Sequence, residues 1–226
     1  MKTVNQPQTP LSDEDNEIKN QMEKVVDSYD AYMKKITLGR ENKLREMTVN
    51  LAQVKPGDSV LEAGCGTGTL TIEAKRKAGP LGKVFGIDII PGMIELGRQK
   101  AAKANLDVTF QLGSIDQIPF PDGQFDVVMC SFMIFHMSEA VRRKGIEEIY
   151  RVLKPKGKLT VIDLSLLVHR FPRAIVKLFL GFMLNHDLKE LLPFMERTGF
   201  AGTELMPAKF RIFGLPVLSY VRGSKP

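Results

Sequence analysis

The chain has 226 residues, which is enough for one buried core of the α/β type and too short for two enzyme domains. Its 32 Lys and Arg against 26 Asp and Glu give a formal net charge of +6, an excess that favours anionic partners or surfaces without amounting to a nucleic-acid footprint. The two cysteines, Cys65 and Cys130, are too few for a disulfide scaffold or a four-thiolate metal site. We therefore expect a reducing, cytoplasmic setting and no metal.

The first 16 residues are rich in Gln, Pro, Asp and Asn, and we expect them to form a flexible arm. They are polar and acidic, unlike a signal peptide, and no stretch of the chain approaches the roughly 18 charge-free apolar residues that a membrane span requires. Residues 17–226 are predicted to form one domain. Its expected parts are a helical cap over 17–53, a core over 54–165, a lid over 166–200 and terminal strands over 201–226.

After the cap, whose helical pattern is interrupted near residues 37–39, strand and helix patterns alternate. Five buried strands are predicted over 59–63, 83–88, 108–113, 125–132 and 158–165. Helices are predicted over 67–78, 91–104, 139–153, 171–184 and 187–197, and two short strands follow near 203–212 and 215–222. Strands that alternate with helices at this spacing predict a parallel sheet with helices on both faces, a doubly wound α/β fold.

The stretch VLEAGCGTGTL at 60–70 places Gly64, Gly66 and Gly68 where the first strand turns into its helix. In such sheets ligands bind at this edge, and glycines let a ligand lie against the backbone. A dinucleotide site has its third glycine one place later. Glu62 disfavours a pyrophosphate and suits a cationic ligand, and Asp88 at the end of the second strand can accept both hydroxyls of a ribose. The arrangement fits S-adenosylmethionine.

Four motifs occur in order at the expected intervals: VLEAGCGTGTLT, FGIDIIPGMIELGR, GSIDQIPFPDGQFDVVMCSF and EIYRVLKPKGKLTVID. On these the sequence resembles the class I S-adenosylmethionine-dependent methyltransferases, within them the ubiquinone/menaquinone C-methyltransferase branch, over roughly residues 28–165. The resemblance implies a Rossmann-like doubly wound sheet, mostly parallel with an antiparallel C-terminal strand pair and an N-terminal helical cap. It also implies S-adenosyl-L-methionine as cofactor and S-adenosyl-L-homocysteine as product.

The resemblance also implies a set of cofactor-binding residues. Glu62 and the glycine turn would line the methionine and ribose parts, and Asp88 would hold the ribose hydroxyls. The family commonly has Asp at the position of Ser114, so either Ser114 or Asp116 would accept from the adenine amino group. The full expected set is Glu62, Gly64, Cys65, Gly66, Gly68, Asp88, Ile89, Met93, Ser114, Ile115, Asp116, Cys130 and Ser131.

Two residues are candidates for the acceptor side and for catalysis. His136 follows the fourth strand, where the family places an acceptor-side residue, and Tyr29 lies in the cap that would cover the cofactor. A base is needed only if the acceptor arrives protonated. The Phe- and Met-rich stretch after the fifth strand predicts a small, lipophilic acceptor, such as a quinone-like ring or a phospholipid amine. The basic, apolar helix over 170–184 is either a lid that touches the membrane peripherally or an ordinary core-facing helix with a solvated edge.

Three alternatives stay open. The acceptor could be protein or nucleic acid, although the fourth strand ends in MCSF and no basic run is interleaved with aromatics. The chain could be a nicotinamide-dependent oxidoreductase, against which the glycine spacing and the lack of a Tyr-x-x-x-Lys pair argue. It could also bind the cofactor without transferring a methyl group. The methylated atom, the use of a base, the oligomeric state and the pathway are not indicated by the sequence.

Overall fold

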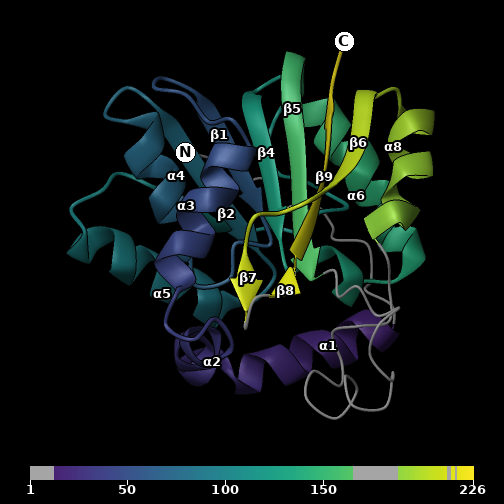
Figure 1. Ribbon diagram of the computed structural model, residues 1–226. Coiled ribbons are helices and arrows are strands. Elements are labelled where there is room, and N and C mark those ends of the chain that lie inside the picture. Colours follow the sequence, from purple (N-terminus) through teal and green to yellow (C-terminus); the bar gives the residue numbers. More distant parts are fainter. Residues whose placement is uncertain (1–12, 165–187, 213–214, 217) are drawn as a thin grey trace.

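The computed structural model describes residues 13–164, 188–212, 215–216 and 218–226. Its main feature is a seven-stranded sheet of order β3-β2-β1-β4-β5-β9-β6 (Figure 1). The strands are β1 (Ser59–Ala63), β2 (Lys83–Asp88), β3 (Thr109–Leu112), β4 (Phe125–Ser131), β5 (Leu153–Leu164), β6 (Ala201–Pro207) and β9 (Leu218–Ser224). The neighbours from β3 to β5 pair in parallel, whereas β9 pairs antiparallel with both β5 and β6. The strand order reverses between β1 and β4, so the ligand crevice of such a sheet is expected at the carboxyl ends of these two strands.

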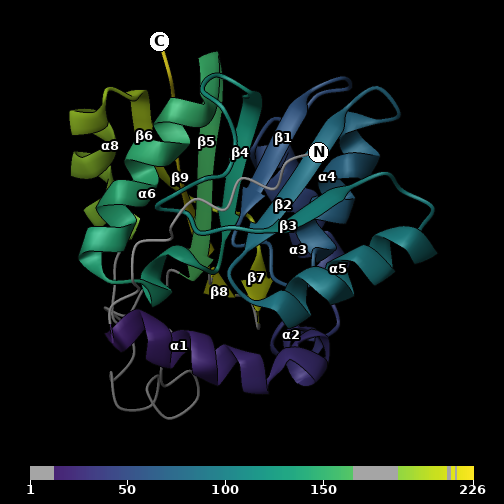
Figure 2. The same ribbon diagram turned by 180° about the vertical axis from the view of Figure 1, so that it is seen from behind.

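Helices cover both faces of the sheet. One face holds α3 (Glu41–Leu51), α4 (Thr69–Ala78) and α5 (Pro91–Lys103), and the other holds α6 (Glu139–Val152) with η4 (Leu188–Leu191) and α8 (Leu192–Thr198). Because successive side chains of a strand point to opposite faces, Val60 packs in the cluster beneath α3 and α4, and Leu61 packs in the cluster beneath α6. In Figure 1 α3 is in front of the sheet, and in the reverse view of Figure 2 α6 is in front.

A helical cap lies across one end of the sheet in both views (Figures 1 and 2). It comprises α1 (Asp13–Lys24), η1 (Val26–Ser28) and α2 (Tyr29–Ile36). The expected interruption after α2 is present, because Leu38 and Gly39 both have positive φ. A flexible arm was expected over residues 1–16, but residues 13–16 belong to α1, which begins at Asp13. Its acidic first turn favours a helix N-terminus. Residues 1–12 lie outside the described part.

Most of the other predicted boundaries agree with the structure within one residue, but three parts of the chain differ more. The helix expected at residue 67 begins at Thr69, because Gly68 adopts a left-handed φ of 75° as its N-cap. The strand expected from residue 158 already begins at Leu153, and the pairing of β4 with β5 has an irregularity between Phe125 and Val127. The chain end forms four strands, not two: β6, β9 and the small pair β7 (Arg211–Ile212) and β8 (Leu215–Pro216). The predicted helix over 171–184 lies outside the described residues.

Candidate functional site

A cavity of about 450 Å³ lies between the cap and the carboxyl ends of β1, β2 and β4. Its volume suits a ligand of nucleoside size or larger. It is lined by ten of the residues expected from the sequence: Tyr29, Gly64, Gly66, Asp88, Ile89, Met93, Ser114, Ile115, Ser131 and His136. Segments far apart in the chain are therefore brought together at one edge of the sheet.

Much of the remaining wall is apolar and was not expected from the sequence. The cap contributes Met22, Val25 and Met33, and the segment after β4 contributes side chains that include Met133 and Met137. Sequence reasoning missed these residues because an apolar side chain on a helix or in a loop looks the same whether it packs into the core or lines a cavity. The methionine content was the available signal, since flexible thioether side chains adapt to apolar ligands.

Asp88 is held at the end of β2 by the backbone around it. One carboxylate oxygen accepts the N–H of Gly66 at 2.8 Å, and the other accepts the N–H of Ile90 at 3.0 Å. Burial raises the pKa of Asp88, and these backbone donors lower it. Each carboxylate oxygen has capacity for another hydrogen bond. The side chain therefore connects β2 to the glycine turn and can still accept hydroxyl groups from the cavity.

The three glycines of the turn all have positive φ, but their surroundings differ. A Cβ on Gly64 would lie 2.3 Å from the Met133 side chain, and a Cβ on Gly66 would contact the Tyr29 ring at 3.7 Å. Both positions line the cavity. A Cβ on Gly68 would instead lie 2.5 Å from the ring of Phe110. Gly68 thus allows close helix–strand packing and does not line the cavity, and its expected place in the ligand site stays a prediction.

Four further residues of the expected cofactor set do not line the cavity. Cys65 packs in the cluster between α4, α5 and β3, and Cys130 is buried in the cluster beneath α6. Burial raises the pKa of both thiols. Asp116 accepts a hydrogen bond from the Ser114 hydroxyl, so it is Ser114 that reaches the cavity. The two cysteine side chains therefore point into the packed layers on opposite faces of the sheet, and not toward the ligand edge.

Glu62 is the fourth of these residues. Its side chain is buried, and its carboxylate accepts a hydrogen bond from the hydroxyl of Thr71 on α4. Burial raises the pKa of Glu62 to about 7, against the opposing effects of Thr71 and Arg45. The carboxyl group is therefore balanced between its neutral and charged forms at neutral pH. A cation in the nearby cavity would favour the charged form.

Tyr29 and His136 face the cavity from opposite walls, the cap and the segment after β4. Burial raises the pKa of Tyr29 to about 12, so the phenol stays protonated at neutral pH. Burial lowers the pKa of His136, so the imidazole is neutral at pH 7. A neutral imidazole can accept a proton, whereas a protonated phenol can only donate or share one. His136 is the better candidate for a base.

The cap is tied to the glycine turn by a polar cluster. Asp30 on α2 accepts a hydrogen bond from the hydroxyl of Thr67 at 2.6 Å, and the ammonium of Lys100 lies 2.5 Å from the other carboxylate oxygen. Lys100 also donates to the hydroxyls of Thr67 and Thr69. These contacts join α2, the glycine turn and α5, and they fix the cap helix that carries Tyr29.

Arg45 is a site residue that sequence reasoning missed. It is 6% exposed, lies on the inner face of α3 and donates to the hydroxyl of Ser131 at the end of β4, at 3.3 Å. Its other partner is Glu41, one turn earlier, at 3.1 Å. The sequence signal was an Arg four residues before Val49 on the buried stripe of the helix.

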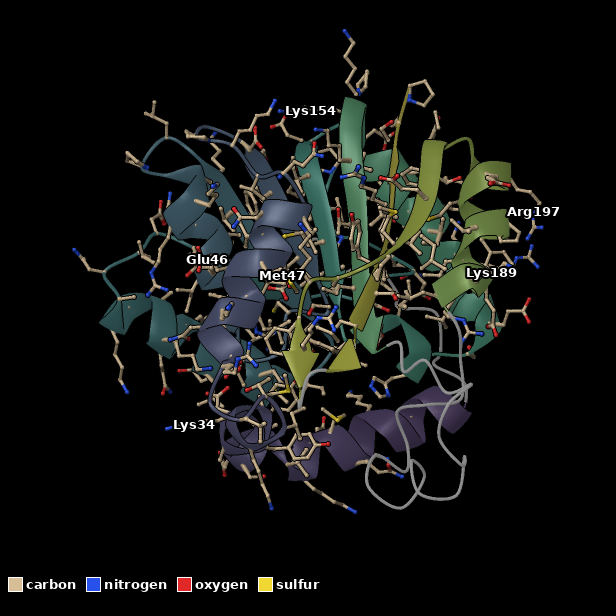
Figure 3. The ribbon with its side chains drawn as sticks, viewed as in Figure 1. Lys34, Glu46, Met47, Lys154, Lys189 and Arg197 are labelled. Carbon is tan, nitrogen blue, oxygen red and sulfur yellow. The ribbon has the colours of Figure 1, made fainter. Side chains whose placement is uncertain are left out.

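The opposite end of the sheet is structural. Asp126, at the start of β4, accepts the N–H of Ser59 at 2.8 Å and pairs with Lys154 at 2.7 Å, and Figure 3 shows Lys154 at the end remote from the cap. Within the described residues no cluster of His, Cys, Asp and Glu is suited to a metal ion. No helix in the described part of the chain is both long and apolar enough to cross a membrane.

Comparisons with known proteins indicate the family of this chain. The family described as a methyltransferase domain matches residues 60–157. A demethylmenaquinone methyltransferase of Symbiobacterium thermophilum is 34% identical over 170 residues, which are 74% of this chain and 66% of that protein. One of Lactobacillus johnsonii is 36% identical over 144 residues, 63% of this chain and 58% of that protein. The chain thus spans less than two thirds of the length of these relatives.

Solved structures show the same fold. An S-adenosylmethionine-dependent methyltransferase of Thermotoga maritima, described as a possible histamine N-methyltransferase, has a TM-score of 0.71 at 20% identity, over 92% of this chain and 100% of that one. One of Aquifex aeolicus has a TM-score of 0.66 at 22% identity, over 90% and 98%. The chain belongs to the class I S-adenosylmethionine-dependent methyltransferase family. The family and the fold predicted from the four motifs are confirmed.

Proposed function

We propose that the protein transfers the methyl group of S-adenosylmethionine to a small, apolar acceptor with a quinone-like ring. The observation that supports this most is that Asp88 and the glycines Gly64 and Gly66 line the same cavity as a set of apolar side chains. The polar part suits a nucleoside, and the apolar part suits a ring or a lipid. The curated relatives act, by their names, on demethylmenaquinone.

The residues present fit the cofactor. Asp88 has acceptor capacity for two ribose hydroxyls, and the backbone of the two cavity glycines carries no Cβ, which at Gly64 would clash with Met133 and at Gly66 would contact Tyr29. Ile89 and Ile115 supply apolar surface for an adenine ring, and Ser114 supplies a hydroxyl near it. Glu62, whose pKa lies at about 7, would be held in its charged form by the positive charge of the cofactor. We therefore propose for these residues the cofactor-binding roles that were expected from the sequence.

When bound, the cofactor supplies a methyl group on a positively charged sulfur, which is already activated for displacement. The chain has to bind the acceptor in line with that group and to exclude water. Met22 and Val25 of the cap, with Met133 and Met137 after β4, close the cavity with apolar surface. His136 faces the same space and is neutral at pH 7, so it can take up the proton that an acceptor loses.

Binding of the cofactor is tested by calorimetry with S-adenosylmethionine and S-adenosylhomocysteine, with NADH as the comparison. We expect both sulfur compounds to bind and NADH not to bind. Asp88→Asn removes the charge from two expected hydrogen bonds to ribose and should weaken binding by roughly 10- to 100-fold. The matched control is Asp126→Asn, at the other end of the sheet. Tight binding of NADH with no heat from the sulfur compounds would refute the proposal.

Methyl transfer is tested with radiolabelled S-adenosylmethionine and reduced demethylmenaquinone in detergent. Label in the extracted quinone, absent without enzyme, is the expected result. Parallel reactions contain phosphatidylethanolamine vesicles, total RNA or a protein extract as acceptor. Label in one of these fractions, with none in the quinone, would replace the proposed acceptor class while leaving the cofactor assignment intact.

A further inference from the structure

A buried arginine contacts the cavity residue Ser131 from the face of the sheet opposite α6. Arg45 lies one turn into α3, which begins beside the cap and runs along the sheet (Figure 1). One terminal nitrogen of its guanidinium donates to the hydroxyl oxygen of Ser131, and the other is 3.1 Å from Glu41. A charge as deeply buried as this one is costly unless its partners compensate it. Packing of α3 against the sheet does not by itself account for a charge buried at this position.

Ser131 lines the cavity, and its hydroxyl has a hydrogen left to donate. Ser131 is 7% exposed and lines the cavity at the carboxyl end of β4. Its oxygen accepts the hydrogen bond from Arg45, which leaves the hydroxyl hydrogen to donate elsewhere. Among the described residues no hydrogen-bond acceptor for this hydrogen is observed. The positive charge of Arg45 polarises the hydroxyl and strengthens it as a donor.

The backbone at this point is strained in a way that presents these groups to the cavity. Phe132 follows Ser131 with a φ of 56°, a left-handed conformation that costs free energy for a residue with a bulky side chain. Its ring lines the cavity, and the Arg45 guanidinium stands 5.9 Å from its centroid. The chain is held there by a hydrogen bond from Phe132 N–H to the carbonyl of Ile162, at 3.0 Å. Strain of this kind is typical of a functional position.

We propose that Ser131, polarised by Arg45, binds an ionisable ring oxygen of the methyl acceptor and favours its anionic form. This deepens the proposed function and rests on it. The acceptor class would then be hydroxylated aromatic rings such as quinols or naphthols, not amines. Ser131 touches the acceptor, and Arg45 acts through Ser131 as a positioning and polarising residue. The expected place of Ser131 beside the methionine end of the cofactor puts the bound oxygen next to the methyl group.

The chemistry balances without a further reagent. The ring hydroxyl loses its proton, with His136 or water as the recipient, and the resulting oxyanion supplies electron density to the ring. A ring carbon then forms the bond to the methyl group, and the electron pair of the broken sulfur–methyl bond stays on sulfur, which becomes neutral. The ring carbon loses its hydrogen as a proton to water, and the aromatic ring is restored. Measured from the neutral bound acceptor, a donor aimed at the oxygen lowers the barrier, because it stabilises the negative charge that the oxygen carries in the anion and still partly carries in the transition state.

A binding experiment tests the proposal without methyl transfer. The protein, saturated with S-adenosylhomocysteine, is titrated with 1-naphthol, whose anion absorbs at longer wavelength than its neutral form. The charged or titratable groups around Arg45 and Tyr29 are Glu41, Glu62 and Asp88, and His136 faces the same cavity. All of these remain in the variants, so a difference from the wild type reports the altered side chain.

At one pH we expect about tenfold less bound naphtholate in Ser131→Ala and in Arg45→Met than in the wild type. Arg45→Lys keeps the charge and should restore part of the signal. Arg76→Met is the control, because Arg76 pairs with Glu73 at 3.0 Å on α4 but is solvent-exposed. Should the wild type fail to bind 1-naphthol, or should Ser131→Ala bind the anion as well as the wild type does, the proposal is wrong.

Kinetics separate this role from a structural or cofactor role. With reduced demethylmenaquinone, Ser131→Ala should lower kcat by at least about tenfold and leave the KM of S-adenosylmethionine within about twofold. A large rise in the KM of S-adenosylmethionine would show instead that Ser131 binds the cofactor. If Arg45→Met does not fold, Ser131→Ala and Arg45→Lys still decide the question. If no variant, nor the wild type, transfers a methyl group to any acceptor, the proposed function fails, and the naphthol measurement still reports on Ser131.

Discussion

The hydroxyl of Thr67, in the glycine turn, donates a hydrogen bond of 2.6 Å to the carboxylate of Asp30 on the cap helix α2. Lys100 of α5 completes this cluster by pairing with Asp30 at 2.5 Å. Lys100 also donates to the hydroxyls of Thr67 and Thr69, so the cluster joins the cap directly to the cofactor turn and to α5. The position of the cap over the cavity therefore depends on a partly exposed cluster that a single substitution can weaken.

We expect Asp30→Ala to loosen the cap without unfolding the sheet. Because Asp30 and Lys100 are partly exposed, the loss is modest, about 1 kcal/mol, or roughly fivefold. Amide hydrogen exchange in α2 should become faster by about that factor, and S-adenosylhomocysteine should dissociate correspondingly faster. Glu73→Ala, which breaks an exposed ion pair on α4, is the control. Unchanged exchange in α2 would mean that apolar packing alone holds the cap.

Gly68→Ala is expected to destabilise the protein more than a glycine substitution at an open position. At Gly68 a Cβ would lie 2.5 Å from the ring of Phe110, and the φ of 75° is unfavourable for alanine. Gly123 has a similar φ of 63° but nothing within 4 Å of the added Cβ. The difference between Gly68→Ala and Gly123→Ala isolates the clash, which should cost about 1–3 kcal/mol in the free energy of unfolding. Urea unfolding measures it, and equal losses in the two variants would contradict the packing role.

Much of the fold followed from local patterns in the sequence. The strands over 59–63 and 83–88 were predicted to the residue, because each is an apolar run bounded by turn residues. The position of Asp88 beside the glycine turn was also predictable, since parallel strands bring their carboxyl ends to one edge. The insertion of β9 between β5 and β6 was not, because a sequence pattern does not specify which strands pair.

The site was predictable only where residues sit in a motif. Gly68 and Cys65 are in the motif, but the backbone of Gly68 packs close to Phe110 and the side chain of Cys65 packs in the same cluster. The residue types in a short turn do not reveal which positions face the ligand and which face the core. Arg45 is outside every motif and reaches Ser131 across 86 positions of sequence. Its role follows from tertiary packing of α3, which local propensity does not encode.

Tyr29→Phe tests whether the phenol acts as a base. Burial raises the pKa of Tyr29 to about 12, so the hydroxyl stays protonated over the range in which the enzyme can be assayed. We expect the variant to keep the pH dependence of kcat and the packing of the ring beside Gly66. His136→Gln should lower kcat. The wild type should lose activity at low pH as the imidazole becomes protonated, and because burial lowers the pKa of His136, this loss should occur at a lower pH than for an exposed histidine. If kcat of the wild type changes at high pH and this change is absent in Tyr29→Phe, then Tyr29, and not His136, is the group that exchanges a proton in the reaction.

The carboxyl group of Glu62 should make the ligand-free protein less stable as the pH rises. Its pKa is about 7 in the folded state and 4.5 as the ordinary value. Between these two values the unfolded chain has lost the proton while the folded chain retains it, so the free energy of unfolding falls with rising pH. The contribution is complete below pH 4.5 and is lost as the pH passes about 7, with an upper limit of about 3 kcal/mol.

Glu62→Gln removes this titration and keeps an oxygen that can accept the Thr71 hydroxyl. Relative to the wild type, the variant should therefore gain stability as the pH rises from 5 to about 7 and gain little more by pH 8, as measured by urea unfolding at each pH. Glu147→Gln, at an exposed position of α6, should give a difference that does not change with pH. Saturating S-adenosylmethionine should abolish the wild-type loss, because its positive charge stabilises the ionised carboxylate. A constant difference between Glu62→Gln and the wild type across this range would show that the carboxyl group titrates near its ordinary value, and that its burial is relieved by water or by motion of the turn.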